Sequence, residues 1–213
     1  METDGSLSLI ASKKSNVRNP DDLKGKNISV SGNTFVEYAT DEVMKRACLH
    51  PGEVNKPEIN NIPLRLMMLE DGQISASFLP GPATAIALND GHTALLNTRQ
   101  MGLRCTGIVF SEKAITEKDE EIRRFITGYN LGVKYLQTRP QNEWTEILVK
   151  EFGLQEKAAM QIDLPDYRSA TRPSYHDIEK IIAWLKSKGA IPDYYPGENL
   201  VDTTFIPGTL KPQ

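Results

Sequence analysis

The sequence predicts an α/β protein whose first half forms one compact lobe around a mainly parallel sheet. Short apolar strands alternate with helical patterns between residues 24 and 97, and this alternation is typical of parallel sheets that helices cover on both faces. Beyond residue 110 the pattern becomes helical, with too few strands for those helices to cover. The second half is therefore expected either to pack on the first lobe or to lack part of the natural protein.

Apolar runs and helical spacing indicate the elements of the first half. The strands are expected at residues 7–11, 27–30, 74–79 and 93–96, and the helices at residues 35–47, 63–72 and 82–89. Pro63 opens the second of these helices, because proline is favoured in a first helical turn, and Gly72 ends it. The polar residues 13–23 are expected to form a turn region around Asn19-Pro20.

The second half is expected to be helical after one more strand, at residues 103–110. Thr116, with Asp119 three residues later, is a capping pattern that starts a long helix, and Arg139-Pro140 ends it. Two more helices are expected at residues 140–153 and 175–189, the last opening with the same capping pattern. The tail from residue 191 is rich in proline, glycine and tyrosine and is expected to form loops.

Charge and composition argue against several classes of protein. Lys and Arg number 25 against 28 Asp and Glu, a net charge of -3, whereas nucleic-acid binders usually carry a basic excess. No run of about 18 apolar residues is present to span a membrane. The acidic start is unlike the basic and then apolar opening of a signal peptide. Cys48 and Cys105 stand far apart, so two core thiols are expected rather than a disulfide framework or a zinc site.

Signatures of catalysis and of cofactor binding are absent from the sequence. It contains no Gly-x-Ser-x-Gly elbow, phosphate-binding loop, His-Glu-x-x-His or Cys-x-x-Cys motif. His50, His92 and His176 fall in separate elements, and each is expected at the surface or at a helix end. The carboxylates lie mostly beside Lys and Arg, as on solvated helix faces. The sequence therefore predicts no catalytic residue, no metal site and no cofactor.

Two junctions between a strand and a helix are the candidate binding features. Val30-Ser31-Gly32-Asn33-Thr34 follows one strand, and Leu79-Pro80-Gly81-Pro82 follows another. Ligands of α/β sheets bind where strands end, and the N–H groups and dipole of a helix start suit an anion or a polar carbonyl edge. The same residues also serve as ordinary helix caps or strand stops. Their expected meeting at one sheet edge favours the binding interpretation.

A resemblance to a known family runs in order along the chain. It is carried by the segments at residues 11–13, 22–34, 63–66, 71–82, 109–113, 130–135, 184–189 and 200–207. They resemble the substrate-binding proteins of ABC importers for nitrate, sulfonates, taurine and thiamine-pyrimidine precursors. This family is a branch of the type II periplasmic binding proteins. No single segment is highly specific, but the ordered set is.

The resemblance implies a two-lobed clamp that holds a solute between its lobes and closes by hinge bending. Residues 1–21 would be a strand and crossover segment of the first lobe, and residues 22–101 the complete second lobe. Residues 102–213 would be a crossover strand and the helical C-terminal part of the first lobe. Because family members carry an export signal and most of the first lobe ahead of the segment that matches Leu7, this chain is expected to be truncated. The expected fold is thus one complete parallel-sheet lobe with a helix-rich remnant of the other.

Carried over position by position, the resemblance implies that the ligand contacts are Ser31, Gly32, Asn33, Thr34, Glu37, Pro80, Gly81, Tyr129 and Asn130. The family often has an acidic residue where Gly81 stands and an aspartate where Ser75 stands, and these departures leave the solute open. Hydroxyls and amides, without an arginine in the turn, favour a small polar or heteroaromatic solute.

The expected function is capture of such a solute, a thiamine-pyrimidine precursor, a sulfonate or a nitrate-like anion, for an ABC permease and without catalysis. The natural precursor is expected to be periplasmic or membrane-anchored outside the cytoplasm. An apolar surface left by the missing lobe predicts a homodimer or poor solubility. One alternative is a thiamine-pyrimidine biosynthesis enzyme on the same fold, although the cysteine-rich motif of those synthases is absent. The other is a ligand sensor module.

Overall fold

The computed structural model describes residues 2–3, 7–160, 162, 164 and 166–206. The chain divides into two compact units. Unit 1 comprises Met1–Asp4, Arg104–Leu154 and Pro165–Gln213, and unit 2 comprises Gly5–Leu103 and Gln155–Leu164. Within the described residues, no helix is both long and apolar enough to cross a membrane.

Unit 2 is built on a four-stranded sheet in the order β3-β4-β2-β5. Its strands are β2 (Leu7–Ala11), β3 (Ile28–Ser29), β4 (Ala76–Pro80) and β5 (Thr93–Asn97). β3 runs parallel to β4, but β2 lies between β4 and β5 and is antiparallel to both. The expected mainly parallel sheet is therefore a mixed sheet. A five-residue apolar run predicts a buried strand but carries no information about its direction.

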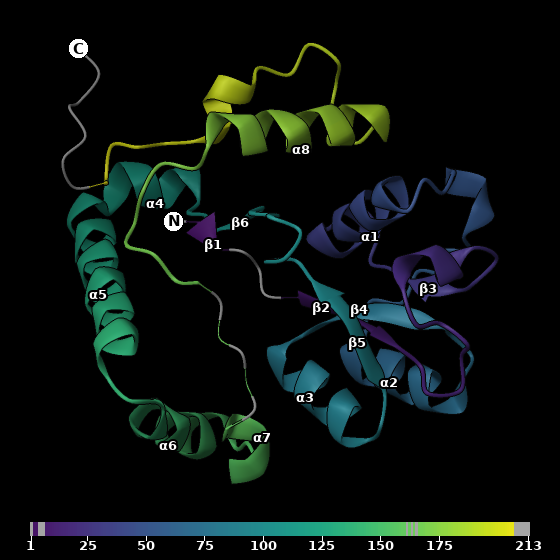
Figure 1. Cartoon of the computed structure of the whole chain (residues 1–213). Helices are drawn as coiled ribbons and strands as arrows, with labels where there is room; N and C mark the ends of the chain where they lie inside the picture. Colours follow the sequence, from purple (N-terminus) through teal and green to yellow (C-terminus); the bar gives the residue numbers. More distant parts are fainter. Residues whose placement is uncertain (1, 4–6, 161, 163, 165, 207–213) are drawn as a thin grey trace. The chain divides into compact units, whose positions relative to one another are not determined.

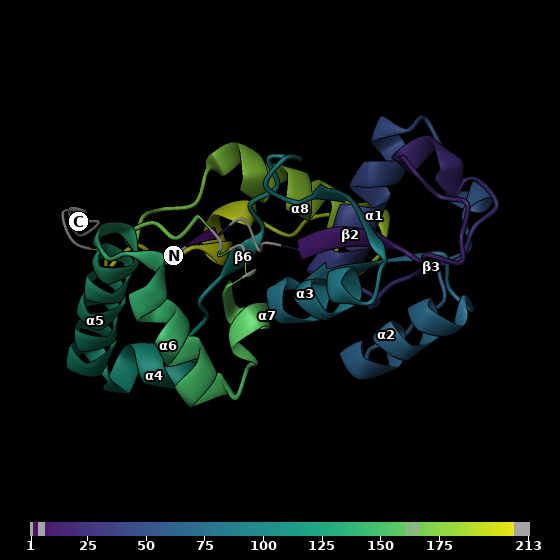
Figure 2. The same cartoon turned by 60° about the horizontal axis from the view of Figure 1, so that its bottom comes forward.

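Helices cover both faces of this sheet. α1 (Phe35–Arg46) lies on one face, and α2 (Ile62–Asp71) and α3 (Gly81–Asn89) lie on the other (Figures 1 and 2). Between the sheet and the α2–α3 layer is a core cluster of Ile10, Ile59, Leu69, Ile74, Leu79, Ala83 and Ala87. Two short 3-10 helices, η1 (Pro20–Leu23) and η2 (Pro51–Glu53), flank the sheet, and α7 (Glu156–Met160) packs on α3.

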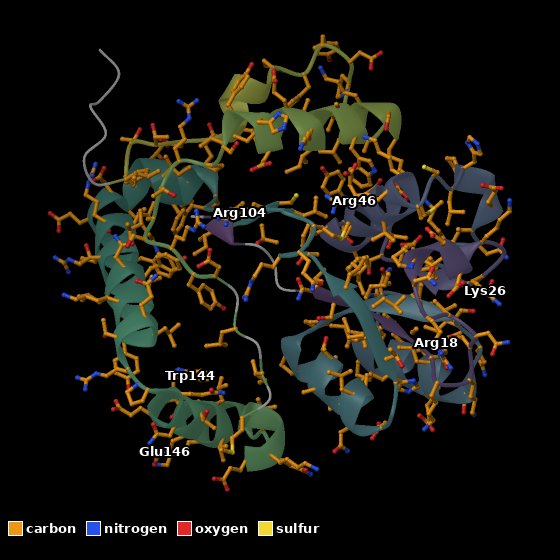
Figure 3. All side chains as sticks on the ribbon, viewed as in Figure 1. Arg18, Lys26, Arg46, Arg104, Trp144 and Glu146 are labelled. Carbon is orange, nitrogen blue, oxygen red and sulfur yellow. The ribbon has the colours of Figure 1, made fainter. Side chains whose placement is uncertain are left out.

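The ends of α2 follow from local residues, and its end at Gly72 is the one that the sequence predicts. The Asn61 side chain caps α2 by accepting from Leu64 N at 2.9 Å. Gly72 ends the helix in the left-handed conformation, with φ of 76°, which glycine adopts without a steric penalty. At the end of α1, Arg46, labelled in Figure 3, donates from Nη2 to Met101 O at 2.5 Å and so ties the helix to the end of the Gly5–Leu103 segment of unit 2.

Unit 1 is mainly helical. Its helices are α4 (Glu112–Glu117), α5 (Asp119–Thr138), α6 (Gln141–Phe152) and α8 (Tyr175–Ser187), followed by the 3-10 helix η3 (Gly197–Leu200). Its core cluster contains Ile122, Ile126, Ala170 and Phe205. The described strands are β1 (Glu2–Thr3) and β6 (Thr106–Gly107), which pair antiparallel. The strand expected at residues 103–110 is therefore only two residues long.

The start of the helical part differs from its prediction. Ser111, not Thr116, is the first cap, because its side chain accepts from Ala114 N at 3.2 Å and starts α4. Thr116 lies inside α4 and donates to Glu112 O and Lys113 O. The cap of α8 is as expected, with Ser174 Oγ accepting from Asp177 N at 3.4 Å.

The unit boundaries also differ from the expected ones. Residues 7–21 belong to unit 2 and not to a first lobe, because β2 has strand partners on both sides in the unit 2 sheet. Gln155–Leu164 returns to unit 2 from within the helical part. Neither cysteine forms a disulfide with a described residue, and the expectation of two core thiols is wrong because Cys48 is exposed and Cys105 only partly buried.

Candidate functional site

The carboxyl ends of β3 and β4 lie at the same edge of the unit 2 sheet, because the two strands run parallel. β3 continues through Val30 into the turn at residues 31–34 and then α1, and β4 runs directly into α3 at Gly81. The two junctions singled out in the sequence therefore meet, as expected. Residues 31–34 together with Pro80 and Gly81 are called the β3–β4 edge below.

The turn at residues 31–34 is held by its own polar groups. Thr34 caps α1, with Oγ1 accepting from Val36 N at 3.2 Å and donating to Ser31 O at 2.8 Å. Asn33 has a φ of 54°, and its N–H donates to Glu37 Oε2 at 2.8 Å. Glu37 also lies 3.7 Å from Lys56 Nζ. Asn33, Thr34 and Glu37 thus shape the turn, so the helix-cap interpretation holds for them whatever else they do.

Several backbone donors of this turn remain available. The N–H groups of Ser31, Gly32 and Phe35 donate to no acceptor within the described residues. They stand at the start of a 12-residue helix, where the helix dipole favours negative charge. A Cβ at Gly32 would approach Glu58 Oε1 to 3.2 Å. Glycine therefore lets the backbone pass close to that carboxylate.

Arg65 is the charged residue beneath this edge. Its side chain projects from α2, and the residue is only 2% exposed. Nε donates to Ile59 O at 2.6 Å, Nη1 to Phe78 O at 3.3 Å, and Nη2 to Ser31 Oγ. Burial lowers the pKa of the guanidinium below its usual value. These bonds join β4 to the turn after β3.

Arg65 is not among the site residues predicted from the sequence. A signal was available in its position, because a single arginine stands within the apolar run Leu64-Arg65-Leu66-Met67-Met68-Leu69. It precedes the fully buried Leu69 by four residues, so both lie on the same face of α2. Arginine is almost never fully buried unless it is paired.

Pro80 and Gly81 form the second half of the edge. Pro80 is the N-cap of α3 and makes no side-chain capping bond, while Thr84 Oγ1 donates to Leu79 O at 3.0 Å. A Cβ at Gly81 would lie 3.7 Å from Ile162 Cγ2, an ordinary contact. A side chain at position 81 would thus point toward Ile162, and Gly81 itself offers only its backbone to a ligand.

Tyr129 and Asn130 belong to unit 1, on α5, whereas the other seven candidates belong to unit 2. Asn130 Oδ1 accepts from Ala170 N at 2.7 Å, which is a structural contact. The Tyr129 hydroxyl is buried without a hydrogen-bond partner in the part of the chain that the structure describes. Its burial, with a smaller contribution from Tyr167, raises the pKa of Tyr129.

The histidines divide into two kinds. All three were expected at the surface or at a helix end. His50 and His176 are exposed, as expected, but His92 is buried. Its Nδ1 accepts from Lys13 N at 3.0 Å, and its Nε2 lies 3.1 Å from Glu70 Oε2. Both ring nitrogens are therefore used in structural contacts. No cluster of three or more His, Cys, Asp or Glu side chains able to hold a metal occurs among the described residues.

The sequence of this chain matches a known protein family. The family model described as NMT1/THI5 like matches residues 4–143. No curated protein matches the chain by sequence.

Solved structures of ligand-binding proteins share the fold. The periplasmic aliphatic sulphonate binding protein SsuA from Escherichia coli matches with a TM-score of 0.68 and 13% identity, over 89% of this chain and 62% of its own. The ligand-binding component of an ABC-type import system from Staphylococcus aureus matches with a TM-score of 0.74 and 12% identity, over 89% of this chain and 66% of its own. The chain thus spans less than two thirds of the length of these two proteins.

An enzyme shares the fold as well. The desulfurization enzyme DszB matches with a TM-score of 0.65 and 12% identity, over 94% of this chain and 74% of its own. Identities this low establish only the fold. The family assignment rests on the family model, which matches well over half of the sequence. The chain belongs to the NMT1/THI5-like family and has the α/β fold of the type II periplasmic binding proteins.

Proposed function

We propose that this chain is part of the solute-binding component of an ABC importer and that the β3–β4 edge contacts the solute. The family and the two importer binding proteins of the same fold support a solute-binding role. The observation that carries the proposal is the convergence at one sheet edge of three unpaired N–H donors, the Ser31 hydroxyl and the buried Arg65. A small number of polar groups that converge at the end of a sheet is typical of a small-molecule site.

The proposed solute is small and polar or heteroaromatic: a thiamine-pyrimidine precursor, a sulfonate or a nitrate-like anion. The proposed contacts in unit 2 are Ser31, Gly32, Asn33, Thr34, Glu37, Pro80 and Gly81, and those in unit 1 are Tyr129 and Asn130. Asn33, Thr34 and Glu37 would act mainly by shaping the turn. Ser31 and Gly32 would supply the direct donors.

A thermal-shift screen tests this proposal. The probes are aminopyrimidines, alkanesulfonates, taurine, nitrate and bicarbonate, each titrated against the purified chain. A ligand that binds the folded state raises its melting temperature by mass action, so a dose-dependent rise with one class is expected. No rise with any class, despite a cooperative unfolding transition, would contradict the proposal.

The proposed role is binding without catalysis. The alternative, an enzyme, is favoured by one observation, the shared fold of the desulfurization enzyme DszB. Against it, both ring nitrogens of the buried His92 are occupied, so this residue is unsuited to act as a base. Recovery of an unchanged solute after prolonged incubation would support binding. A product whose formation is abolished by Cys105→Ala would support the enzyme.

The partner proposed for the full-length protein is an ABC permease, and the proposed location is outside the cytoplasm, as for the periplasmic SsuA. Self-association stays a prediction. Its structural basis is apolar side chains open to solvent in unit 1, with Val109 90% and Leu131 64% exposed. Light scattering after size exclusion is expected to give a dimer for the wild-type chain and a monomer for Val109→Glu.

A further inference from the structure

Arg65 is a buried cation without a partner of opposite charge. The residue is 2% exposed, and all of its hydrogen bonds go to neutral oxygens: Ile59 O, Phe78 O and Ser31 Oγ. Within the described part of the chain, no carboxylate forms an ion pair with it. Burial of an ionised group without a counter-charge is unfavourable. The positive charge beneath the edge is therefore uncompensated by the protein.

The neighbouring carboxylates are occupied elsewhere. Glu37 receives the Asn33 N–H at 2.8 Å and lies 3.7 Å from Lys56 Nζ. Glu58 accepts from Asn60 Nδ2 at 3.3 Å and lies against Gly32. Neither comes within ion-pair distance of Arg65, so the positive charge is held apart from both.

The contact with Arg65 fixes the role of the Ser31 hydroxyl. A guanidinium can only donate hydrogen bonds, so Ser31 Oγ is the acceptor in this contact. The single hydroxyl hydrogen of Ser31 must then point away from Arg65. Ser31 Oγ has no second partner among the described residues. Ser31 is thereby oriented as a donor, beside the unpaired N–H groups of Ser31, Gly32 and Phe35.

We infer that Arg65 is a specificity-determining residue that acts through Ser31, so that the β3–β4 edge selects an anionic oxygen over a neutral oxygen of the same shape. This inference rests on the proposed function. Arg65 itself is a positioning residue, because its burial keeps it behind Ser31. Its charge acts on the ligand through the short, poorly solvated region between Arg65 and Ser31, where electrostatic interactions are stronger than in water. Of the solute classes above, the sulfonates and nitrate-like anions fit this edge, and neutral aminopyrimidines do not.

The test compares methanesulfonate with dimethyl sulfone, a neutral molecule of similar shape with the same kind of oxygen. Calorimetry on the wild-type chain is expected to show methanesulfonate binding at least about tenfold more tightly, since hydrogen bonds to charged groups are the stronger ones. Ser31→Ala should weaken methanesulfonate binding by about tenfold or more. The matched control is Ser15→Ala, because the Ser15 hydroxyl donates to Ser12 O in the same unit and does not touch the edge.

Two further variants test the charge. Arg65→Gln should reduce the preference for methanesulfonate over the sulfone, and Arg65→Lys should keep most of it, because the positive charge is retained. Circular dichroism establishes that each variant is folded. Where Arg65→Gln does not fold, the comparison of Ser31→Ala with Ser15→Ala decides alone.

The outcomes separate this inference from the proposed function. Equal affinity of the wild-type chain for both probes, or equal methanesulfonate affinity of Ser31→Ala and Ser15→Ala, would overturn the inference. If the thermal-shift screen finds an aminopyrimidine and no anion, the proposed function stands and the inference is overturned. If no probe of any class binds, both fail.

Discussion

At the scale of single residues, His92 shows how a polar side chain can hold unit 2 together. It joins the exit of β2, through Lys13 N, to the end of α2, through Glu70. His92→Ala is expected to destabilise unit 2 by about 2 kcal/mol, because the partly buried Lys13 N–H loses its acceptor and a cavity is left where the buried ring stood. Urea denaturation measures the effect. His176→Ala, at an exposed position of α8, is the matched control and should change stability by less than about 0.5 kcal/mol. Equal stability of the two variants would contradict this role.

Glu70, the partner of His92, also pairs with Lys13, and this makes the stability of unit 2 sensitive to acid. The hydrogen bond from Lys13 Nζ, at 2.7 Å, is the main cause that holds the pKa of Glu70 below its ordinary value of 4.5. A pKa lowered by folding means that the ionised carboxylate stabilises the fold above the unfolded-state value, and that this stabilisation is lost as the pH falls through the lower, folded-state value. Glu70→Gln should therefore cost stability at neutral pH and little below that range. Denaturation curves at neutral and acid pH test this, with Asp71→Asn, an exposed neighbour, as the control. A deficit of Glu70→Gln that stays the same at both pH values would contradict it.

Residue patterns predicted the β3–β4 edge but not the charge beneath it. Ser31, Gly32, Pro80 and Gly81 were recognisable because glycine and small polar residues follow an apolar run, which is a local signal. The link from Arg65 to Ser31 joins residues 34 positions apart and exists only after α2 has packed on the sheet. The burial of His92 is non-local in the same way. Interactions of this kind have no signature in the spacing of neighbouring residues.

At the scale of elements, glycine conformation gives a prediction with an internal control. Gly72 ends α2 with φ of 76°, and a Cβ there would approach Lys14 Cβ to 3.1 Å. Gly25 has a similar φ of 73° with nothing within 4 Å of the same position. Both Gly→Ala changes should cost about 1–2 kcal/mol from the left-handed backbone, and Gly72→Ala should cost more because of the contact. Gly52→Ala, free of both features, should be close to neutral in thermal denaturation. A loss for Gly25→Ala that equals or exceeds that for Gly72→Ala would show that the contact with Lys14 does not matter.

Most helix ends were predicted from the sequence, but the pairing of the strands was not. Pro63, Gly72, Gly153 and Ser174 mark helix ends through local backbone chemistry, which acts within a few residues. Thr116 carried the same capping signal as Ser174, but Ser111 started an earlier helix and left Thr116 inside it. The direction of β2 depends on which strands it pairs with, and an apolar run is the same in either direction. Pairing over such sequence distances is decided by the packed sheet.

At the scale of the whole molecule, the two units differ in how they bury their backbone. In unit 2, β2 has hydrogen-bonded strand partners on both sides, and Leu9, Ile10 and Ala11 are at most 1% exposed. In the described part of unit 1, the sheet is a single pair of two-residue strands, and Val109, just beyond it, is 90% exposed. Local opening costs least where few apolar contacts and few protected hydrogen bonds must be broken. The two units are therefore expected to open with different free energies.

Hydrogen exchange followed by mass spectrometry tests this difference directly. Peptides from β2 and β4 should exchange slowest, at rates set by unfolding of unit 2, and peptides covering residues 104–109 should exchange fastest. A solute bound at the β3–β4 edge should slow exchange further in residues 31–37, where its proposed donors lie, because binding stabilises the folded state. His176→Ala should leave the slow peptides unchanged, whereas His92→Ala should speed them, since the contact it removes lies within unit 2. If all peptides exchanged at one common rate, the chain would open as a single cooperative body, and the separate cores would carry no separate stability.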